Sequence, residues 1–213
     1  MQCSSVEDSS AMFITVEGIE GCGKSTLLAG LSERLRDRGR ETIVTREPGG
    51  SPAGDAVRAI FLDPSLSLAP LTEALLINAS RVQHVLETIE PALRRGAVVL
   101  CDRFVDSTLA YQGYGRGIAL DLLRGICDAA TGGREPDATF ILDVPIAISR
   151  ARVASRRGGL DRLDHEADAF YERVRAGYLD LARSHPRYRV IDATKSAAEV
   201  LADALAAVEA RIA

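Results

Sequence analysis

Short apolar runs alternate along this chain with longer stretches of helical periodicity. Five runs are apolar enough for buried strands, at residues 13–17, 42–45, 97–101, 139–144 and 188–191. Helical patterns occupy 27–39, 53–62 and 71–95, the segment after Pro145, and the C-terminal segment with apolar positions from 200 to 212. Because buried parallel strands are apolar throughout rather than alternating, this order predicts an α/β fold. We expect a five-stranded, doubly wound parallel sheet with helices on both faces and functional loops at the carboxyl ends of its strands.

Size and composition favour a single domain. The chain has 213 residues, 46% of them hydrophobic, and a net charge of −4. We expect one domain over 12–213, preceded by a disordered, polar leader at 1–11 that lacks the apolar core of a signal peptide. The acidic balance argues against nucleic acid as a partner, and no apolar run reaches the ~20 residues that span a membrane. Four cysteines without C-x-x-C spacing favour reduced thiols and a cytoplasmic protein.

The segment after the first apolar run carries the most specific local motif. It fits G-x-x-x-x-G-K-[ST], the phosphate-binding loop, with an apolar strand before it and a helix after it. Backbone N–H groups of such a loop surround phosphate oxygens, Lys24 reaches the β and γ phosphates, and the Ser25 hydroxyl binds Mg²⁺. The motif therefore predicts a nucleoside triphosphate with Mg²⁺, held by Gly18, Ile19, Glu20, Gly21, Cys22, Gly23, Lys24, Ser25 and Thr26.

Asp102 follows the apolar run at 97–101 directly. A carboxylate at the carboxyl end of a strand, in a chain with a phosphate loop, fits a second Mg²⁺ position, bound directly or through water. The alternative is an N-cap for a helix that begins near Val105. We expect the metal role.

Several longer motifs occur in order along the chain. They are T-R-E-P-G-G at 45–50, Ser80-Arg81, Asp102-Arg103-Phe104, D-S-T-L-A-Y-Q-G at 106–113, G-G-L-D-R at 158–162 and Ile191-Asp192-Ala193. With these motifs the chain resembles bacterial thymidylate kinases, which are P-loop nucleoside monophosphate kinases. The resemblance implies phosphoryl transfer from ATP to dTMP, giving ADP and dTDP for dTTP synthesis, and a homodimer.

The resemblance also implies roles for the acceptor site. Arg81 and Arg103 would hold the dTMP phosphate, which planar guanidinium groups suit. Glu20 would approach the 3′-hydroxyl, and Glu47 the acceptor phosphate with its metal or water. The remaining residues implied are Arg58 near the base, Thr108 and Gln112 on the thymine ring, and Tyr111 under the sugar, where it disfavours a 2′-hydroxyl.

An arginine-rich segment around Gly158-Gly159 suggests a mobile lid over about 152–165. A guanidinium delivered on closure would stabilise the charge of the transition state. In the resembling family this arginine comes from the phosphate loop or from the lid, and Ile19, Glu20, Gly21 and Cys22 include none. We therefore expect Arg157 and Arg162, which flank the matching G-x-L-D-R segment, to be catalytic rather than Arg152 or Arg156.

One position departs from the family pattern. Relatives place a phenylalanine that stacks on thymine four residues before Arg81, where this chain has Ile77. Since stacking on an aromatic ring is worth roughly 1–3 kcal/mol elsewhere, Ile77 predicts weaker dTMP binding or a relaxed preference among pyrimidine monophosphates. Ile77 could instead be core, with Tyr114 helping to cover the base.

Three other activities remain open from the sequence. A kinase for dUMP or for several deoxynucleotides is compatible with Ile77. A GTP-dependent switch is disfavoured, because the chain's one asparagine, Asn78, does not begin an N-K-x-D run. A nucleic-acid-stimulated ATPase is disfavoured by the negative net charge.

Overall fold

The computed structural model describes residues 11–155 and 162–212. Its central feature is a five-stranded, entirely parallel sheet in the order β2-β3-β1-β4-β5. The strands are β1 Met12–Glu17, β2 Thr42–Arg46, β3 Val98–Asp102, β4 Ala138–Asp143 and β5 Tyr188–Asp192. Strands β1, β3 and β4 are almost completely buried, which explains their continuous apolar sequences. The predicted α/β fold and all five strands are confirmed.

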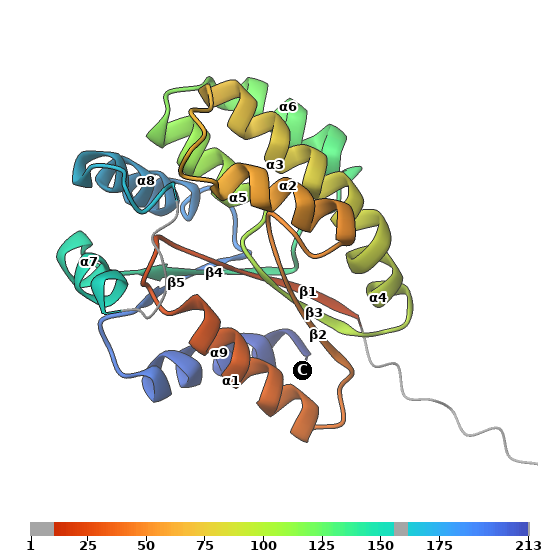
Figure 1. Cartoon of the computed structure of the whole chain (residues 1–213). Helices are drawn as coiled ribbons and strands as arrows, with labels where there is room; N and C mark the ends of the chain where they lie inside the picture. The colour runs from red at the N-terminus through yellow and green to blue at the C-terminus, as the bar shows by residue number, and fades with distance from the viewer. Residues whose placement is uncertain (1–10, 156–161, 213) are drawn as a thin grey trace, which may run out of the picture.

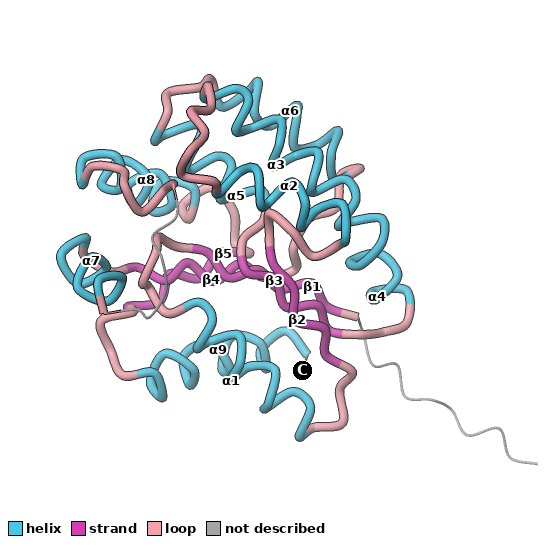
Figure 2. Tube along the Cα trace, in the orientation of Figure 1, coloured by secondary structure: helices cyan, strands magenta, loops and turns pink. Residues whose placement is uncertain are grey.

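Helices cover both faces of the sheet. Helices α1 and α9 lie together on one face, while the larger group that includes α3, α4, α5 and α8 lies on the other (Figures 1 and 2). The helices are α1 Lys24–Asp37, α2 Pro52–Leu62, α3 Pro70–His84, α4 Glu90–Arg94, α5 Val105–Thr108, α6 Leu120–Thr131, α7 Ile146–Ala154, α8 Asp168–Leu181 and α9 Ala197–Ile212, with π-helical turns η1 Val85–Ile89 and η2 Leu109–Gly115.

The topology changes direction at β1, which pairs with β3 on one side and β4 on the other. Ligands of doubly wound sheets bind outside the carboxyl ends of the strands at such a point. Here the register pairs both Val16 of β1 and Arg46 of β2 with Asp102 of β3. Three loops, those after β1, β2 and β3, therefore meet at one edge of the sheet.

The long helical pattern at 71–95 forms one continuous helical segment that contains a π-helical turn. Helix α3 passes into the π-helical turn η1, and α4 then starts with Pro91 in its first turn. Proline lacks the N–H that an α-helix uses, and here it follows the π-helical turn, where the regular α-helical hydrogen bonding is already interrupted. Within the described residues, no helix is both long and apolar enough to cross a membrane. Residues 156–161, which include Arg157 and most of the predicted lid centre, lie outside the described residues.

Candidate functional site

The phosphate loop joins β1 to α1, and its glycines are required by its shape. Gly18 has φ +135°, and a Cβ there would lie 2.6 Å from the carbonyl oxygen of Leu142. Helix α1 begins at Lys24, so its N-terminal N–H groups open into the loop. The Lys24 Nζ donates to the carbonyl oxygens of Gly18 and Ile19 at 3.2 Å each. One ammonium group is thus held at the mouth of an anion-binding loop.

Ser25 and Asp102 have the chemistry expected for a Mg²⁺ position. Ser25 is exposed at the start of α1, and Asp102 closes β3. Asp102 Oδ1 is buried and has no hydrogen-bond donor among the residues that the structure describes. In the described ranges, no three or more His, Cys, Asp or Glu side chains are grouped so that they could hold a metal ion by themselves. Mg²⁺ with nucleotides typically takes one or two protein oxygens together with phosphate oxygens, so these two residues fit such an ion.

Arg103 lies at the centre of the polar contacts around the loop. Its backbone has φ +73°, the left-handed region that few non-glycine residues adopt. Its guanidinium donates to Ser107 Oγ and Tyr178 OH at 3.1 Å, to Tyr111 OH at 3.0 Å and to Glu20 Oε1 at 2.9 Å. Strained backbone that is held by its surroundings is common at functional sites. Four oxygens fix this side chain in the cleft.

Glu20 pairs with Arg103 inside the phosphate loop. Its second carboxylate oxygen accepts from Tyr111 OH at 2.7 Å. Burial alone would raise the pKa of Glu20, but the charges of Arg103 and Lys24 and the Tyr111 hydrogen bond outweigh it and lower that pKa below its usual 4.5. Glu20 is therefore ionised at neutral pH and can accept a hydrogen bond from a substrate hydroxyl.

Glu17 supports the turn that carries Arg103. This fully buried carboxyl group accepts from the Phe104 N–H at 2.7 Å, the Ser107 hydroxyl at 2.6 Å and Tyr178 OH at 2.9 Å. Burial and the nearby charge of Asp106 raise the pKa of Glu17 to about 7, despite those hydrogen bonds and Arg103. Between pH 4.5 and about 7, the folded protein thus binds a proton that the unfolded chain releases.

A Glu17→Gln variant tests this titration. Because the folded-state pKa is raised, the contribution of Glu17 to the free energy of unfolding is complete below pH 4.5 and is lost as the pH rises through 7. This difference between the ordinary and the raised pKa of Glu17 corresponds to about 3 kcal/mol of unfolding free energy. We expect the wild type to lose about that much stability relative to the variant between pH 4.5 and 8 in urea unfolding. If the difference in unfolding free energy between the two proteins were the same at both pH values, the raised pKa of Glu17 would be contradicted.

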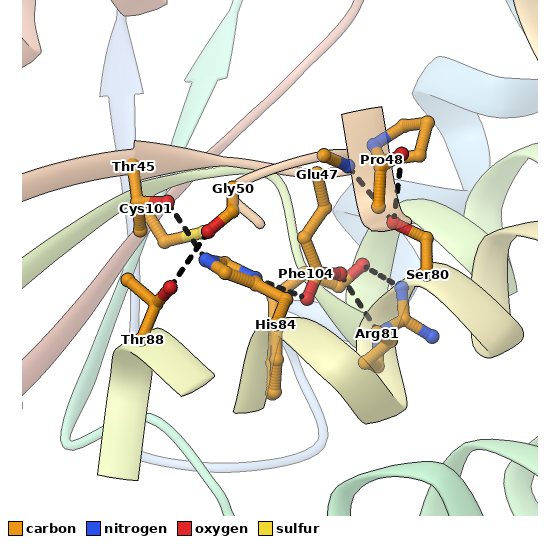
Figure 3. A network of polar contacts seen from close by, with 12 residues as sticks. Thr45, Glu47, Pro48, Gly50, Ser80, Arg81, His84, Thr88, Cys101 and Phe104 are labelled. Atoms are coloured by element: carbon orange, nitrogen blue, oxygen red, sulfur yellow. Dashed lines mark hydrogen bonds and ion pairs between the residues drawn. The ribbon is translucent and has the colours of Figure 1, made fainter. Parts of the chain in front are cut away.

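The T-R-E-P-G-G loop is held by a buried network (Figure 3). Glu47 accepts from Arg81 Nε at 2.8 Å and contacts His84 Nδ1 at 2.9 Å, and His84 Nε2 lies 2.7 Å from Thr45 Oγ1. Gly50 packs against His84, where a Cβ would lie 2.4 Å from the imidazole ring. The Glu47–Pro48 peptide is cis, an isomer that the sequence left open. This network fixes the loop after β2 beside Asp102, whose carbonyl accepts from the Glu47 N–H at 2.9 Å.

Arg81 and Arg103 have different surroundings. Arg81 is 1% exposed, and besides Glu47 it donates to the side chains of Asn78, Cys127 and Thr108 and to the Phe104 carbonyl. Each side-chain nitrogen of Arg81 therefore has a protein acceptor. To hold a phosphate it would first have to release one of them, whereas Arg103 already faces the phosphate loop.

Two cavities meet at this edge of the sheet. The first, of about 610 Å³, is lined by residues 20–27, from the phosphate loop and the start of α1, and also by Asp102, Arg152, Ala193 and Lys195. The second is lined by apolar and polar side chains together, including Phe61, Leu62, Ile77, Arg81, Ser107, Tyr111, Gln112 and Leu163. Four residues line both: Glu20, Glu47, Arg58 and Arg103. The site therefore has two compartments joined at charged side chains, an arrangement suited to two anionic ligands placed end to end.

The structure brings most of the predicted acceptor residues into the second cavity. Arg58 donates to the Pro48 carbonyl at 2.9 Å, and Ile77, 8% exposed, forms part of the cavity wall. Tyr111 packs edge-on against three aromatic rings, all of them from α8. Thr108 does not line this cavity: it is fully buried behind the cavity wall residue Arg81 and accepts from it at 3.0 Å.

The arginines around the predicted lid divide into three groups. Arg157 lies outside the described residues. Arg162 donates to Glu73 at 2.6 Å and to the Phe61 carbonyl at 3.0 Å, away from the phosphate loop. Arg152, which sequence reasoning ranked lower, lines the phosphate cavity and donates to the Gly21 carbonyl at 3.4 Å and the Ala193 carbonyl at 3.0 Å. Arg152 lies in the last turn of α7, and the sequence gave no signal that separated it from the neighbouring arginines.

Comparison with known proteins agrees with this site. The thymidylate kinase family model matches residues 16–204. The thymidylate kinase of Deinococcus radiodurans is 52% identical over 204 residues, covering 95% of this chain and 98% of that one, and that of Desulfovibrio desulfuricans is 49% identical over 93% and 95%. The crystal structure of the thymidylate kinase from Ehrlichia chaffeensis superposes with a TM-score of 0.75 at 35% identity, covering 93% of this chain and 99% of that one. With a two-compartment phosphate site, this fold and these relatives, the chain belongs to the thymidylate kinase family of enzymes.

Proposed function

We propose that this enzyme transfers the γ-phosphoryl group of ATP to dTMP, giving ADP and dTDP. The observation that carries the proposal is the pair of cavities joined at Glu20, Glu47, Arg58 and Arg103. One cavity contains the phosphate loop and Lys24; the other has a mixed apolar and polar wall of the kind that holds a base and sugar. The meeting point of the cavities is where the two phosphate chains would face each other.

The mechanism follows from these positions. An oxygen of the dTMP phosphate attacks the γ-phosphorus, and the bond to the β–γ bridging oxygen breaks. Lys24 and the loop N–H groups would hold the β and γ phosphates, and Arg103 the acceptor phosphate. Mg²⁺, held by Ser25 and Asp102, would neutralise phosphate charge. Glu20 would accept a hydrogen bond from the 3′-hydroxyl, and Tyr111 would pack under the sugar, as the family resemblance implies.

We assign the other predicted residues to supporting roles in the same site. Glu47 and Arg81 would position the acceptor side of the junction through their buried ion pair at 2.8 Å. We still propose Arg157 as the arginine that supplies positive charge when the lid closes. Arg162 is the second candidate, and it forms an ion pair with Glu73. The buried free thiols Cys22, Cys101 and Cys127 fit a cytoplasmic enzyme.

A coupled ADP-release assay with dTMP, dUMP, dCMP and dGMP tests the acceptor. We expect dTMP to have the highest kcat/KM. The kcat/KM for dUMP should differ less from that for dTMP than in a site where an aromatic ring covers the base. The reason is that Ile77 lines the cavity without a π face. A preference for dGMP or dCMP would overturn the proposed substrate.

We also propose a homodimer through the outer surface of α3 and η1. Exposed apolar side chains follow a helical stripe there: Leu71 46%, Leu75 51%, Val82 39% and Leu86 62%, with Leu122 of α6 52% exposed. Helix α6 packs against α3, so it borders the same surface. A contiguous apolar stripe of this kind marks an association surface. Light scattering should give twice the chain mass of 22.8 kDa, and a stable monomer would contradict the dimer.

A further inference from the structure

Glu73 is a buried carboxylate of α3 that accepts hydrogen bonds from three side chains in two other parts of the chain. Its Oε1 accepts from Arg116 Nη2 at 2.9 Å and from Arg162 Nη1 at 2.6 Å. Its Oε2 accepts from Gln112 Nε2 at 3.0 Å and from Arg116 Nε at 3.2 Å. Burial alone would raise the pKa of Glu73, but the hydrogen bonds from Arg116, Gln112 and Arg162 outweigh it and hold that pKa below its usual value. Glu73 is therefore an ionised group that can only accept hydrogen bonds.

That property fixes the orientation of the Gln112 amide. A glutamine amide has a donor and an acceptor of nearly equal shape, and its partners decide which way it faces. Against an ionised carboxylate, only the NH₂ group can face Glu73. The carbonyl oxygen of Gln112 must then point elsewhere, and it is buried with no donor among the described residues. An unsatisfied buried acceptor in a cavity-lining residue marks the position of a ligand donor.

We propose that Glu73 is a positioning residue that selects the base of the acceptor by holding the Gln112 carbonyl oxygen toward it. This inference rests on the proposed function. Thymine and uracil carry an N–H at ring position 3, which Gln112 Oε1 could accept. Cytosine carries an unprotonated nitrogen there, so it would place an acceptor against an acceptor. Sites built to bond a substrate N–H reject analogues that lack it, because a buried group is then left unpaired.

The contacts of Glu73 also predict what Glu73→Gln does. Oε1 accepts from two guanidinium groups and Oε2 from one, at a longer distance, and arginine can only donate. The new carbonyl oxygen therefore stays at the Oε1 position, and the contact from Arg116 Nε is lost. The new NH₂ group then lies at the Oε2 position and faces Gln112. Gln112 must flip to accept from it, and its own NH₂ group turns toward the base. The variant therefore presents a donor where the wild type presents an acceptor.

The experiment is to measure kcat and KM for dTMP and dCMP in the wild type, Glu73→Gln and Glu73→Asp. We expect Glu73→Gln to raise KM for dTMP more than it lowers kcat, and to raise the ratio of kcat/KM for dCMP over dTMP at least tenfold, the scale of one directed hydrogen bond. Glu73→Asp keeps an acceptor-only group, so its ratio should stay near wild type even if its rate falls. Equal ratios in all three proteins, or equal changes in both variants, would overturn the proposal.

Two further variants separate orientation from general damage. Glu166→Gln changes the other carboxylate that pairs with Arg116, at 2.6 Å, and should leave the dCMP to dTMP ratio unchanged. In a Gln112→Met background the amide is absent, so adding Glu73→Gln should no longer shift the ratio. A shift that persists in that background would contradict action through Gln112. Failure of the wild type to use dTMP would instead contradict the proposed function itself.

Discussion

Replacing Lys24 by methionine is expected to lower kcat at least about 10²–10³-fold, since preorganised charge at a transferring group is usually the largest single catalytic term. Lys24 is one of the two lysines of the chain and the one at the loop mouth, with Nζ 3.2 Å from two loop carbonyls. Methionine keeps the length and apolar stem of the side chain but removes its charge. The measurement is steady-state kinetics with saturating dTMP and ATP.

The same variant carries its own structural control. Lys24 contributes no side-chain contact to the acceptor cavity, so dTMP binding by calorimetry and the urea unfolding midpoint should stay close to wild type. A kcat within tenfold of wild type, with folding intact, would show that the ammonium does not stabilise the transferring phosphoryl group.

Replacing Arg103 by a residue without a guanidinium group should lower kcat/KM for dTMP by about 30-fold to several thousandfold. The range corresponds to the 2–5 kcal/mol lost when one partner of a buried, hydrogen-bonded charge pair is truncated. Arg103→Lys is expected to recover little, because one ammonium cannot bond Glu20, Ser107 and Tyr111 while also holding a phosphate. KM for ATP should change much less than KM for dTMP, since the phosphate loop and Lys24 are untouched.

Arg134 provides a matched arginine for this experiment. It forms a 2.6 Å ion pair with Glu90 at the surface, 41% exposed, and lines neither cavity. Arg134→Ala should leave both kinetic constants unchanged. If Arg103→Lys also keeps wild-type kcat/KM for dTMP, Arg103 does not bind the acceptor phosphate and the junction of the cavities has another purpose.

The strands and the phosphate loop could be predicted because their signals are local. A strand buried on both faces needs an apolar residue at nearly every position, as Val98–Asp102 illustrates. The phosphate loop needs glycines at fixed spacing, because Gly18 has no room for a Cβ. Helix α8 was missed although its buried positions 170, 171, 174, 177, 178 and 181 follow helical spacing. Helix α6, which ends at the left-handed Gly132, was missed as well.

The side-chain networks could not be predicted, because their members are far apart in sequence. Gln112 and Glu73 are 39 residues apart, and His84 and Glu47 are 37 apart. Arg81 and Arg103 look equivalent in the sequence, yet the fold holds Arg81 in the buried network with Glu47 and turns Arg103 toward Glu20 of the phosphate loop. Which arginine reaches a ligand is decided by tertiary packing, and residue type alone carries no information about it.

The most direct test of this account is ADP release by the purified wild-type enzyme in the presence of ATP, Mg²⁺ and dTMP. The junction of the phosphate-loop cavity with the mixed apolar and polar cavity, at Arg103 and Glu20, predicts rapid ADP formation that depends on dTMP, with one dTDP made for each ADP. ATP hydrolysis that is indifferent to dTMP, or dTMP left unchanged while ATP and Mg²⁺ are in excess, would contradict it.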